Sequence, residues 1–256
     1  MTGWALDLDG VVWLADQPIP GAAEAIRRLR GAGHDVLFVS NNSSVPLRQV
    51  EDKLARFGIP AHGSVITSAL VAAELVAPQE TALLCAGAGV EEALLARGVA
   101  VVREGDADVV VVGFHREFDY HRLTVACAAV RRGARLLATN DDSTYPTPAG
   151  PIPGGGAILA AVVVGSGAKP MIAGKPHQPM IDTVRRRLGN RGVMVGDRPD
   201  TDGLFARGLG YQFGLVLSGV TQPSDLPVHP DPDMTAADLA TLVDQLLDGG
   251  GAGARA

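Results

Sequence analysis

Short apolar runs alternate with segments of helical periodicity along almost the whole chain of 256 residues. For example, Ala22, Ile26 and Leu29 share one face of a predicted helix, and the apolar run 36–39 follows it. When strands and helices alternate in this way, each helix returns the chain to the same end of the sheet, and the strands pair in parallel. The pattern therefore predicts an α/β fold with a largely parallel sheet.

The same pattern places strands and helices in the rest of the chain. The predicted strands are 4–6, 36–39, 82–85, 99–102, 109–112, 136–139, 171–173, 193–196 and 215–217. The predicted helices begin at Ala22 and Leu47 and recur near 90–97, 119–132, 157–164, 178–188, 202–207 and 236–247. Residues 249–256 are mostly small, and we expect them to form a disordered tail.

Composition excludes several classes of protein. Hydrophobic residues make up 46% of the chain, which argues against disorder, yet no window approaches the roughly 18 apolar residues of a membrane span. No basic segment precedes an apolar one at the start, so we expect no secretory signal. Cys85 and Cys127 are too few and too far apart for a disulfide framework or a zinc site. We therefore expect a cytoplasmic protein that does not bind membranes.

The charge balance argues against a nucleic-acid partner. The formal net charge is −6 and the isoelectric point is near 5.5, whereas nucleic-acid surfaces are basic. The densest basic run, 185–187, lies inside a predicted helix, and we interpret it as a solvated helix face. The six histidines show no spacing typical of metal ligands.

Two aspartates, Asp7 and Asp9, follow the first predicted strand and precede Gly10. Side chains at positions i and i+2 share one face of an extended segment, so both carboxylates can point toward the same pocket. Two like charges brought together are costly unless a cation or a shift in pKa compensates them. Asp and Gly are also ordinary turn residues, so the pair by itself would fit a surface turn equally well.

Further polar residues follow other apolar runs. Ser40 and Asn41 follow the strand 36–39, and Asp197 follows the strand 193–196. Lys175 lies between a short strand and a helix. The carboxyl ends of parallel strands line a crevice in which ligands bind, so distant strands can deliver these residues to one place. Carboxylates suit Mg²⁺, whereas Ser40, the backbone amides near Asn41 and the Lys175 ammonium suit a phosphate.

These residue types together permit phosphoryl transfer. A carboxylate placed against phosphorus can attack it and form an aspartyl-phosphate. Mg²⁺ offsets the repulsion between that carboxylate and the phosphate dianion. The second carboxyl, on Asp9, can then protonate the leaving oxygen and later activate water.

The four motifs in this order resemble those of the haloacid dehalogenase superfamily. They are Asp-Leu-Asp-Gly at 7–10, Ser-Asn-Asn at 40–42, Gly-Lys-Pro at 174–176 and Gly-Asp-Arg-Pro-Asp-Thr-Asp at 196–202. The details are similar to the class IIA branch, which includes NagD-like, pyridoxal-phosphate, glycerol-phosphate and phosphoglycolate phosphatases. That branch is indicated by Ser-Asn-Asn-Ser at 40–43, Ala-Thr-Asn-Asp at 138–141, Pro-Gly-Gly-Gly at 153–156 and Leu-Ser-Gly-Val at 217–220.

The resemblance implies a role for each motif residue in phosphate chemistry. Asp7 would be the nucleophile and Asp9 the general acid and base. The segment Ser40, Asn41 and Asn42 would bind the transferring phosphoryl group. Lys175 would stabilise its charge and orient Asp7. Valine at position 11, where many members carry threonine, is interpreted as tolerated variation.

The resemblance also implies a magnesium site. Mg²⁺ would be held by Asp7, by the backbone carbonyl of Asp9 and by Asp197, with Asp202 as a supporting acid. Asp200 is a weaker candidate for that supporting role. No residue of the core motif set is missing.

The implied architecture is a Rossmann-like core interrupted by an α/β cap of the C2 type. We place the core at 1–79 and 169–256 and the cap at 80–168. The cap would close over the core, exclude water and choose the leaving group. Dimerisation through the cap is a further implication of the resemblance. Asn140, Asp141 and Asp142 follow a predicted cap strand, and either an Asx turn or a role near the substrate or the cap hinge fits them.

The leading hypothesis is thus a Mg²⁺-dependent phosphatase that acts on a small phosphorylated metabolite. A mutase would use the same core, but its cap generally follows the first motif, where this chain has only the short stretch 12–21. A dehalogenase would not use a second acid at the position of Asp9. A non-catalytic metabolite-binding protein on this fold would be expected to lack Asp7, Asp9 or Lys175. The sequence does not distinguish among small phosphomonoesters.

Overall fold

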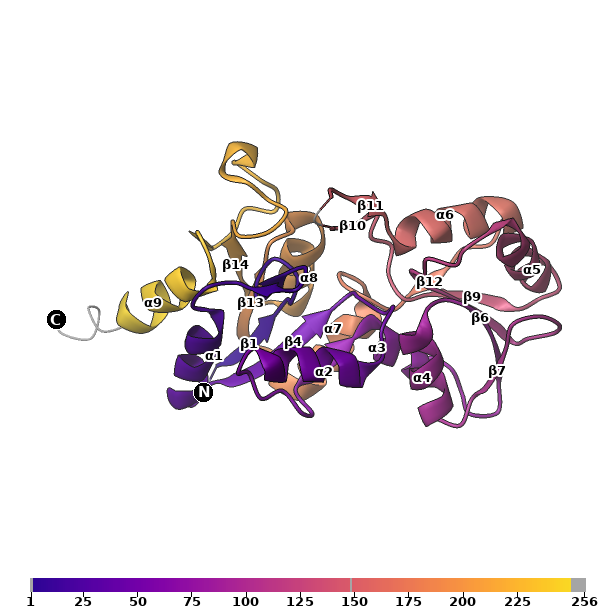
Figure 1. Ribbon diagram of the computed structural model, residues 1–256, viewed down its shortest axis with the longest axis horizontal. Helices are drawn as coiled ribbons and strands as arrows, with labels where there is room; N and C mark the ends of the chain where they lie inside the picture. The colour runs from indigo at the N-terminus through magenta and orange to yellow at the C-terminus, as the bar shows by residue number, and fades with distance from the viewer. Residues whose placement is uncertain (1, 148, 250–256) are drawn as a thin grey trace. The chain divides into compact units, whose positions relative to one another are not determined.

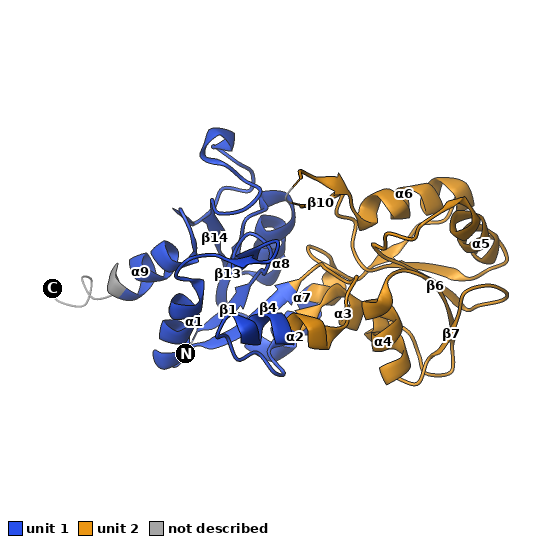
Figure 2. Ribbon diagram, in the orientation of Figure 1, with its two compact units in different colours: residues 1–39, 51–65, 181–256 blue, residues 40–50, 66–180 orange. Residues whose placement is uncertain are grey.

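Figure 1 shows the computed structural model, which describes the chain except for residues 1, 148 and 250–256. Contacts between residues divide the chain into two compact units, which are described separately (Figure 2). The first unit comprises residues 1–39, 51–65 and 181–256, and the second comprises residues 40–50 and 66–180. The predicted tail 249–256 lies outside the described residues except for Gly249, which ends the last helix.

The first unit is built on a six-stranded sheet with the order β15-β14-β13-β1-β4-β5. Its strands are β1 (Gly3–Leu6), β4 (Asp35–Ser40), β5 (Val65–Thr67), β13 (Gly192–Gly196), β14 (Gln212–Val216) and β15 (Met234–Ala236), of which Ser40 and the last two residues of β5 are grouped with the second unit. Strand β1 pairs in parallel with both β13 and β4, so that Trp4 lies opposite Val193 on one side and Val36 on the other. Because helices cover both faces of such a sheet, its central strands are apolar throughout, and all four residues of β1 are buried.

The strand order of this sheet reverses beside β1. From β1 the chain proceeds to β4 and then β5 on one side, and it later returns to β13, β14 and β15 on the other. The junction between β1 and β13 is therefore the topological switch point of the sheet. In open α/β sheets, ligands bind outside the carboxyl ends of the strands at this point. We therefore expect the functional site among the residues that follow Leu6 and Gly196.

The helices that accompany this sheet are α1 (Ala22–Gly31), α2 (Leu47–Arg56), α7 (Gln178–Leu188), α8 (Leu204–Leu209) and α9 (Leu239–Gly249). Helices α8 and α9 contact its strands directly, and the first residues of α2 and α7 are grouped with the second unit. In α1 the buried residues are Ala22, Ala25, Ile26 and Leu29, which lie three or four positions apart and so form one stripe. Helix α1 packs against α9, which also contacts β14 and β15. A two-stranded hairpin of β2 (Trp13–Leu14) and β3 (Gln17–Pro18) precedes α1.

The second unit contains a five-stranded parallel sheet with the order β12-β9-β8-β6-β7. Its strands are β6 (Thr81–Cys85), β7 (Ala100–Val102), β8 (Val109–Val112), β9 (Arg135–Ala138) and β12 (Met171–Ile172), and its helices are α3 (Ser68–Glu74), α4 (Ala88–Ala96), α5 (Tyr120–Arg131) and α6 (Gly155–Ser166). Helices α5 and α6 pack together over one face of the sheet, and α4 lies on the other (Figure 1). Alternate strand residues, such as Val110 and Val112, join the core beneath α5 and α6, as the period of two requires.

The predicted α/β class is confirmed, and each strand and helix expected from the sequence is present, with ends shifted by at most three residues. Strands β5 and β15, helix α3, and the hairpins β2–β3 and β10–β11 (Thr144–Tyr145 and Ile152–Pro153) were not expected. Both β5 and β15 are three-residue strands at sheet edges, too short to give a periodic signal. The predicted boundaries of core and cap, at 79/80 and 168/169, stay a prediction. Among the described helices, none has the length and apolar composition of a membrane span.

Candidate active site

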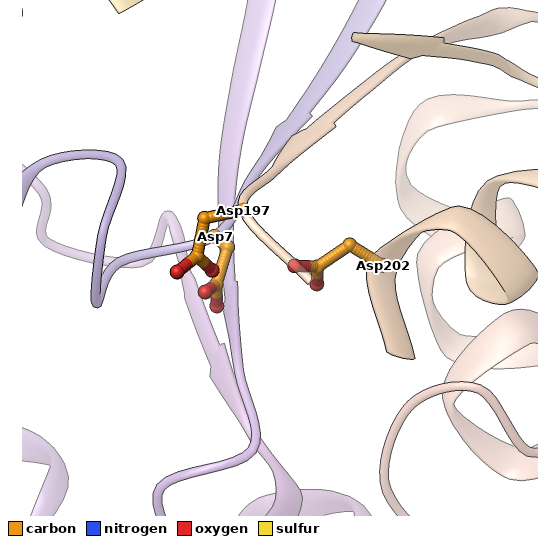
Figure 3. Close-up of side chains that lie close together, drawn as sticks. All are labelled: Asp7, Asp197 and Asp202. Carbon is orange, nitrogen blue, oxygen red and sulfur yellow. The ribbon is translucent and has the colours of Figure 1, made fainter. Parts of the chain in front are cut away.

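Three buried carboxylates converge at the switch point of the first unit. Asp7, Asp197 and Asp202 each offer one carboxylate oxygen, and these oxygens lie within 4.8 Å of one another. The three residues are 8%, 2% and 1% exposed. Figure 3 shows the Asp7 and Asp197 side chains next to each other, with Asp202 reaching toward them from a helical turn. Two of the three are residues that the sequence assigns to the metal, and the third was predicted as a supporting acid.

The sheet register explains why Asp7 and Asp197 meet. Asp7 directly follows β1, and Asp197 directly follows β13, the strand paired with it. The Asp7 backbone N–H donates to the Val195 carbonyl at 2.9 Å, which continues the ladder one residue past the strand. The two carboxylates therefore leave the same edge of the sheet from adjacent strands.

The donor set of this cluster fits a hard divalent cation. Carboxylates at this separation repel one another strongly in a buried site, and a cation or a bound proton offsets the repulsion. Oxygen ligands from two or three carboxylates are the set that Mg²⁺ and Ca²⁺ prefer. Asp7, Asp197 and Asp202 are therefore residues that can hold such an ion.

Asp197 is held by the loop after β14. The Val220 backbone N–H donates to Asp197 Oδ2 at 2.6 Å, and Thr221 Oγ1 donates to the Asp197 carbonyl at 2.6 Å. In the same loop, Ser218 Oγ donates to the Gly10 carbonyl at 2.7 Å, which ties the loop to the first motif. In the sequence, the segment 217–220 is recognisable only as a marker of the class IIA branch. Its function of orienting a candidate metal ligand depends on contacts that sequence spacing does not show.

Two glycines make room for the Asp197 carboxylate. A Cβ on Gly10 or on Gly219 would overlap Asp197 Oδ2, so any larger residue at either position would displace that oxygen. Gly10 also has φ +81°, a conformation that residues with a Cβ rarely adopt. Glycine after Asp9 is therefore required by the space that the Asp197 carboxylate occupies, and not only by the turn.

Asp202 is positioned by a single π-helical turn, Pro199–Gly203, between β13 and α8. The Arg198 backbone N–H donates to Asp202 Oδ2 at 3.1 Å, and Gly196 leaves the space that the Asp202 side chain occupies. Such turns are rare and often occur at functional sites. Asp200, from the same turn, points away: its side chain is 72% exposed and pairs with Arg198 at 3.6 Å.

Asp9 lies outside this cluster of three carboxylates. The Trp13 indole Nε1–H donates to Asp9 Oδ1 at 2.9 Å, and the Gly10 N–H donates to the Trp13 carbonyl at 2.7 Å. Asp9 is therefore held against the start of the β2–β3 hairpin. The predicted role of its backbone carbonyl at the metal stays a prediction.

In the second unit, Asn41 and Lys175 are joined by a pair of hydrogen bonds. The Lys175 backbone N–H donates to Asn41 Oδ1 at 2.8 Å, and Asn41 Nδ2 donates to the Lys175 carbonyl at 3.0 Å. The Asn41 carboxamide thus pairs with both the N–H and the carbonyl of Lys175, as the backbone of a neighbouring β-strand would. Gly174 is needed here because a Cβ at that position would press on Asn41 Oδ1 and on the Thr139 carbonyl.

Asn140 and Asp142 complete this arrangement. Asn140 Nδ2 donates to the Asn41 carbonyl at 2.7 Å, and Asp142 Oδ2 accepts from Asn41 Nδ2 at 3.1 Å. The Asp142 N–H donates to Asn140 Oδ1 at 3.2 Å, which forms the expected Asx turn. His177 pairs with Asp141 at 3.0 Å, and this pairing lowers the pKa of Asp141 below its ordinary value. The Asx turn is one of the two interpretations that the sequence allows, and Asn140 and Asp142 also bond Asn41 directly.

Ser40 and Asn42 shape the same segment through local bonds. Ser40 Oγ accepts from the Asn42 N–H at 3.0 Å, and Asn42 Oδ1 accepts from the Ser44 N–H at 3.0 Å. Asn42 Nδ2 donates to the Tyr145 hydroxyl at 3.3 Å. The carboxamides of Asn41 and Asn42 therefore build the segment, and the Ser40 hydroxyl group and the Asn41 backbone N–H are donors suited to an anion.

We expect Asn41→Ala to lower the free energy of unfolding by about 2–4 kcal/mol, because it leaves the buried backbone groups of Lys175 without their partner. Chemical denaturation followed by circular dichroism measures this change. Asn190→Ala, at an exposed position, is the matched control and should change stability by less than about 0.5 kcal/mol. Equal effects of the two substitutions would contradict the structural role assigned to Asn41.

Comparison with known proteins supplies relatives of this chain. Residues 4–100 match the family model of haloacid dehalogenase-like hydrolases, and residues 172–242 match a second model of the same kind. The 5'-nucleotidase YutF of Bacillus subtilis is 36% identical over 227 residues, which cover 86% of this chain and 88% of that protein.

Solved structures of similar proteins agree with these sequence matches. The 4-nitrophenylphosphatase of Thermotoga maritima superimposes with a TM-score of 0.88 at 31% identity, covering 95% of this chain and 97% of that one. The glycerol phosphate phosphatase of Mycobacterium tuberculosis, solved in complex with calcium, has a TM-score of 0.85 at 32% identity, covering 94% of this chain and 74% of that one. The relatives therefore share both the fold and most of the chain length.

Proposed function

The chain belongs to class IIA of the haloacid dehalogenase-like hydrolases and is a phosphatase, and from this premise we propose that it hydrolyses a small phosphomonoester with Mg²⁺ and with Asp7 as nucleophile. The observation that carries the proposal is the convergence of Asp7, Asp197 and Asp202 at the switch point of the sheet. A carboxylate that lies at the edge of a cation site is well placed to receive an electrophilic phosphorus.

The proposed reaction has two halves. In the first, an Asp7 carboxylate oxygen attacks phosphorus and the bond from phosphorus to the leaving oxygen breaks, while Asp9 gives its proton to that oxygen. In the second, Asp9 takes a proton from water, the water oxygen attacks phosphorus, and the bond to Asp7 breaks to release inorganic phosphate. Both halves need an acid and base beside the nucleophile, and Asp9 is two residues from Asp7.

Three carboxylates are the residues that would hold Mg²⁺, namely Asp7, Asp197 and Asp202, with the Asp9 carbonyl as a further ligand. The ion supplies charge that lets an anionic nucleophile approach an anionic phosphate. Calcium in the structure of the Mycobacterium tuberculosis relative supports a divalent cation in this family.

We propose that the segment Ser40, Asn41 and Asn42 binds the phosphoryl oxygens through the Ser40 hydroxyl group and the Asn41 N–H, together with the Lys175 ammonium. This assignment is supported by the donor groups of these residues, which suit phosphate oxygens, and by the hydrogen bonds that hold the residues in place. Lys175 is only 2% exposed, and its backbone is bonded on both sides by Asn41. A buried ammonium is a strong partner for a phosphate because the low local dielectric strengthens the attraction.

The relatives do not agree on one substrate, since their names specify a 5'-nucleotide, 4-nitrophenyl phosphate and glycerol phosphate. The proposal is therefore limited to small phosphomonoesters. A homodimer formed through the cap and a cytoplasmic location stay predictions.

Phosphate release from a panel of monoesters tests the proposed function. The panel contains glycerol phosphate, phosphoglycolate, pyridoxal phosphate, sugar phosphates, nucleoside 5'-monophosphates and 4-nitrophenyl phosphate. We expect release from at least one member, its loss after treatment with a chelator, and its return when Mg²⁺ is added in excess. Release that continues undiminished after chelation and dialysis would contradict the metal requirement. No release from protein shown to be folded by circular dichroism would contradict the substrate class.

A further inference from the structure

We propose that Trp13, supported by Lys53, is a positioning residue that fixes the orientation of the Asp9 carboxyl group for proton transfer to the leaving oxygen. This inference rests on the proposed function, because it concerns the acid of that reaction. It adds residues outside the four motifs, from the β2–β3 hairpin and from helix α2.

Trp13 is a buried residue with a single polar atom, and that atom bonds Asp9. The indole is 4% exposed, and its Nε1–H donates to Asp9 Oδ1 at 2.9 Å. The backbones of the two residues are also bridged, since the Gly10 N–H donates to the Trp13 carbonyl. The carbonyl oxygen of a carboxylic acid is a better acceptor than its hydroxyl oxygen, so an indole that donates to Oδ1 favours the rotamer in which Oδ2 is the oxygen that donates the proton. The indole thereby selects which oxygen faces the reaction as the acid.

Lys53 holds the indole from helix α2. Its ammonium lies 4.3 Å from the centroid of the Trp13 ring, within the range of a cation–π interaction. The Lys53 side chain is only 18% exposed, which makes the interaction stronger than at an open surface. A cation over the ring also withdraws electron density from the indole and so strengthens its N–H as a donor.

The same lysine secures the hairpin that carries Trp13. Lys53 Nζ donates to the Ala15 carbonyl, and it pairs with Asp16 at 3.7 Å. Ala15 has φ +48°, a conformation that is unfavourable for a residue with a Cβ and persists only where the surroundings enforce it. Phe57, one turn further along the chain, has its ring centroid 6.1 Å from that of Trp13. Lys53 of helix α2 thus fixes both the Trp13 ring and the turn at Ala15 and Asp16.

The chain's other tryptophan shows that burial alone does not explain this bond. Trp4, in β1, is 2% exposed, and its Nε1 has no hydrogen-bond partner among the described residues. The first unit therefore contains one buried indole N–H directed at a carboxylate and one that serves packing only. This contrast supplies a matched control.

The test compares two leaving groups. An alkoxide, as from glycerol phosphate, leaves poorly unless it is protonated, whereas 4-nitrophenolate leaves readily without a proton. The ratio kcat/KM reports the steps up to departure of the leaving group, so it excludes the later attack of water. We expect Trp13→Phe to lower kcat/KM for glycerol phosphate by about 10-fold or more, and that for 4-nitrophenyl phosphate by less than about 3-fold.

Three further variants separate positioning from packing. Trp4→Phe should change both kcat/KM values by the same factor. Lys53→Met should repeat the unequal effect of Trp13→Phe in milder form, and Lys53→Arg, which keeps a cation over the ring, should restore the wild-type ratio. Because Lys53 lies at the edge of the core, its variants answer the question even where Trp13→Phe folds poorly.

The outcomes distinguish this inference from the proposed function. A wild-type enzyme that hydrolyses no ester of the panel would contradict the function itself, and if another alkyl ester of the panel is the better substrate, it takes the place of glycerol phosphate in this comparison. An active wild type whose Trp13 and Lys53 variants lose activity equally on both esters would overturn the positioning role. A leaving-group effect of the same size in Trp4→Phe would also overturn it.

Discussion

Asp7→Asn should reduce phosphate release to background, a fall of about 10⁴-fold or more in kcat. Asparagine has nearly the shape of aspartate, but its amide neither attacks phosphorus nor carries the charge that draws a cation. The backbone bond from Asp7 to the Val195 carbonyl does not involve the side chain, so the fold should persist. Phosphate release by the purified variant, with thermal unfolding to confirm folding, measures this effect.

The control for Asp7→Asn removes a different carboxylate, which lies in the π-helical turn after β13. Asp200→Asn changes a side chain that is 72% exposed and lies outside the cluster, and we expect its activity to stay within about 2-fold of the wild type. If Asp7→Asn kept a tenth of the wild-type activity, the nucleophile would have to be another residue.

Asp197→Ala should weaken binding of Mg²⁺ by more than about 100-fold, since even a residue that only orients a metal ligand typically contributes about 10–100-fold. Asp197 is one of the three converging carboxylates, and its Oδ2 is held by the Val220 N–H. Isothermal titration with Mg²⁺ measures the affinity directly, without need of a substrate. Activity at limiting Mg²⁺ should fall in parallel.

Gly219→Ala tests the same site without removing a carboxylate. The added Cβ would overlap Asp197 Oδ2, so we expect a loss of affinity for Mg²⁺ of about 10-fold. Gly31→Ala is its control, because nothing lies within 4 Å of the position that its Cβ would occupy. Unchanged affinity in Asp197→Ala would exclude this cluster as the Mg²⁺ site.

Most of the site could be predicted because its residues follow strands directly. Asp7 and Asp197 each come next after an apolar run, and parallel pairing then brings them to one edge of the sheet. The alternation of strands and helices could also be predicted, because each central strand is buried on both faces and therefore apolar throughout. The edge strands β5 and β15 are only three residues long, and they gave no periodic signal.

The supports of the site could not be predicted in the same way. Asn41 bonds Lys175 across 134 positions of sequence, and Asp197 is held by residues 23 and 24 positions later. Such partners are chosen by loop geometry, which neither periodicity nor composition records. The position of Trp13, four residues after Asp9, was one available clue, since a buried tryptophan usually finds a partner for its N–H, although Trp4 has none among the described residues.

The way the chain passes between its two units has a consequence for how the protein is made. The first sheet needs Trp4 beside Val193, and closing a loop of about 190 residues costs about 4–5 kcal/mol of chain entropy. The second sheet uses only strands between Thr81 and Ile172, all of which leave the ribosome before β13 does. At about 5–20 residues per second, the inserted sheet can form while β14 and β15 are still being translated. Once it forms, it shortens the flexible path between β1 and β13, so the nascent chain assembles its catalytic sheet last.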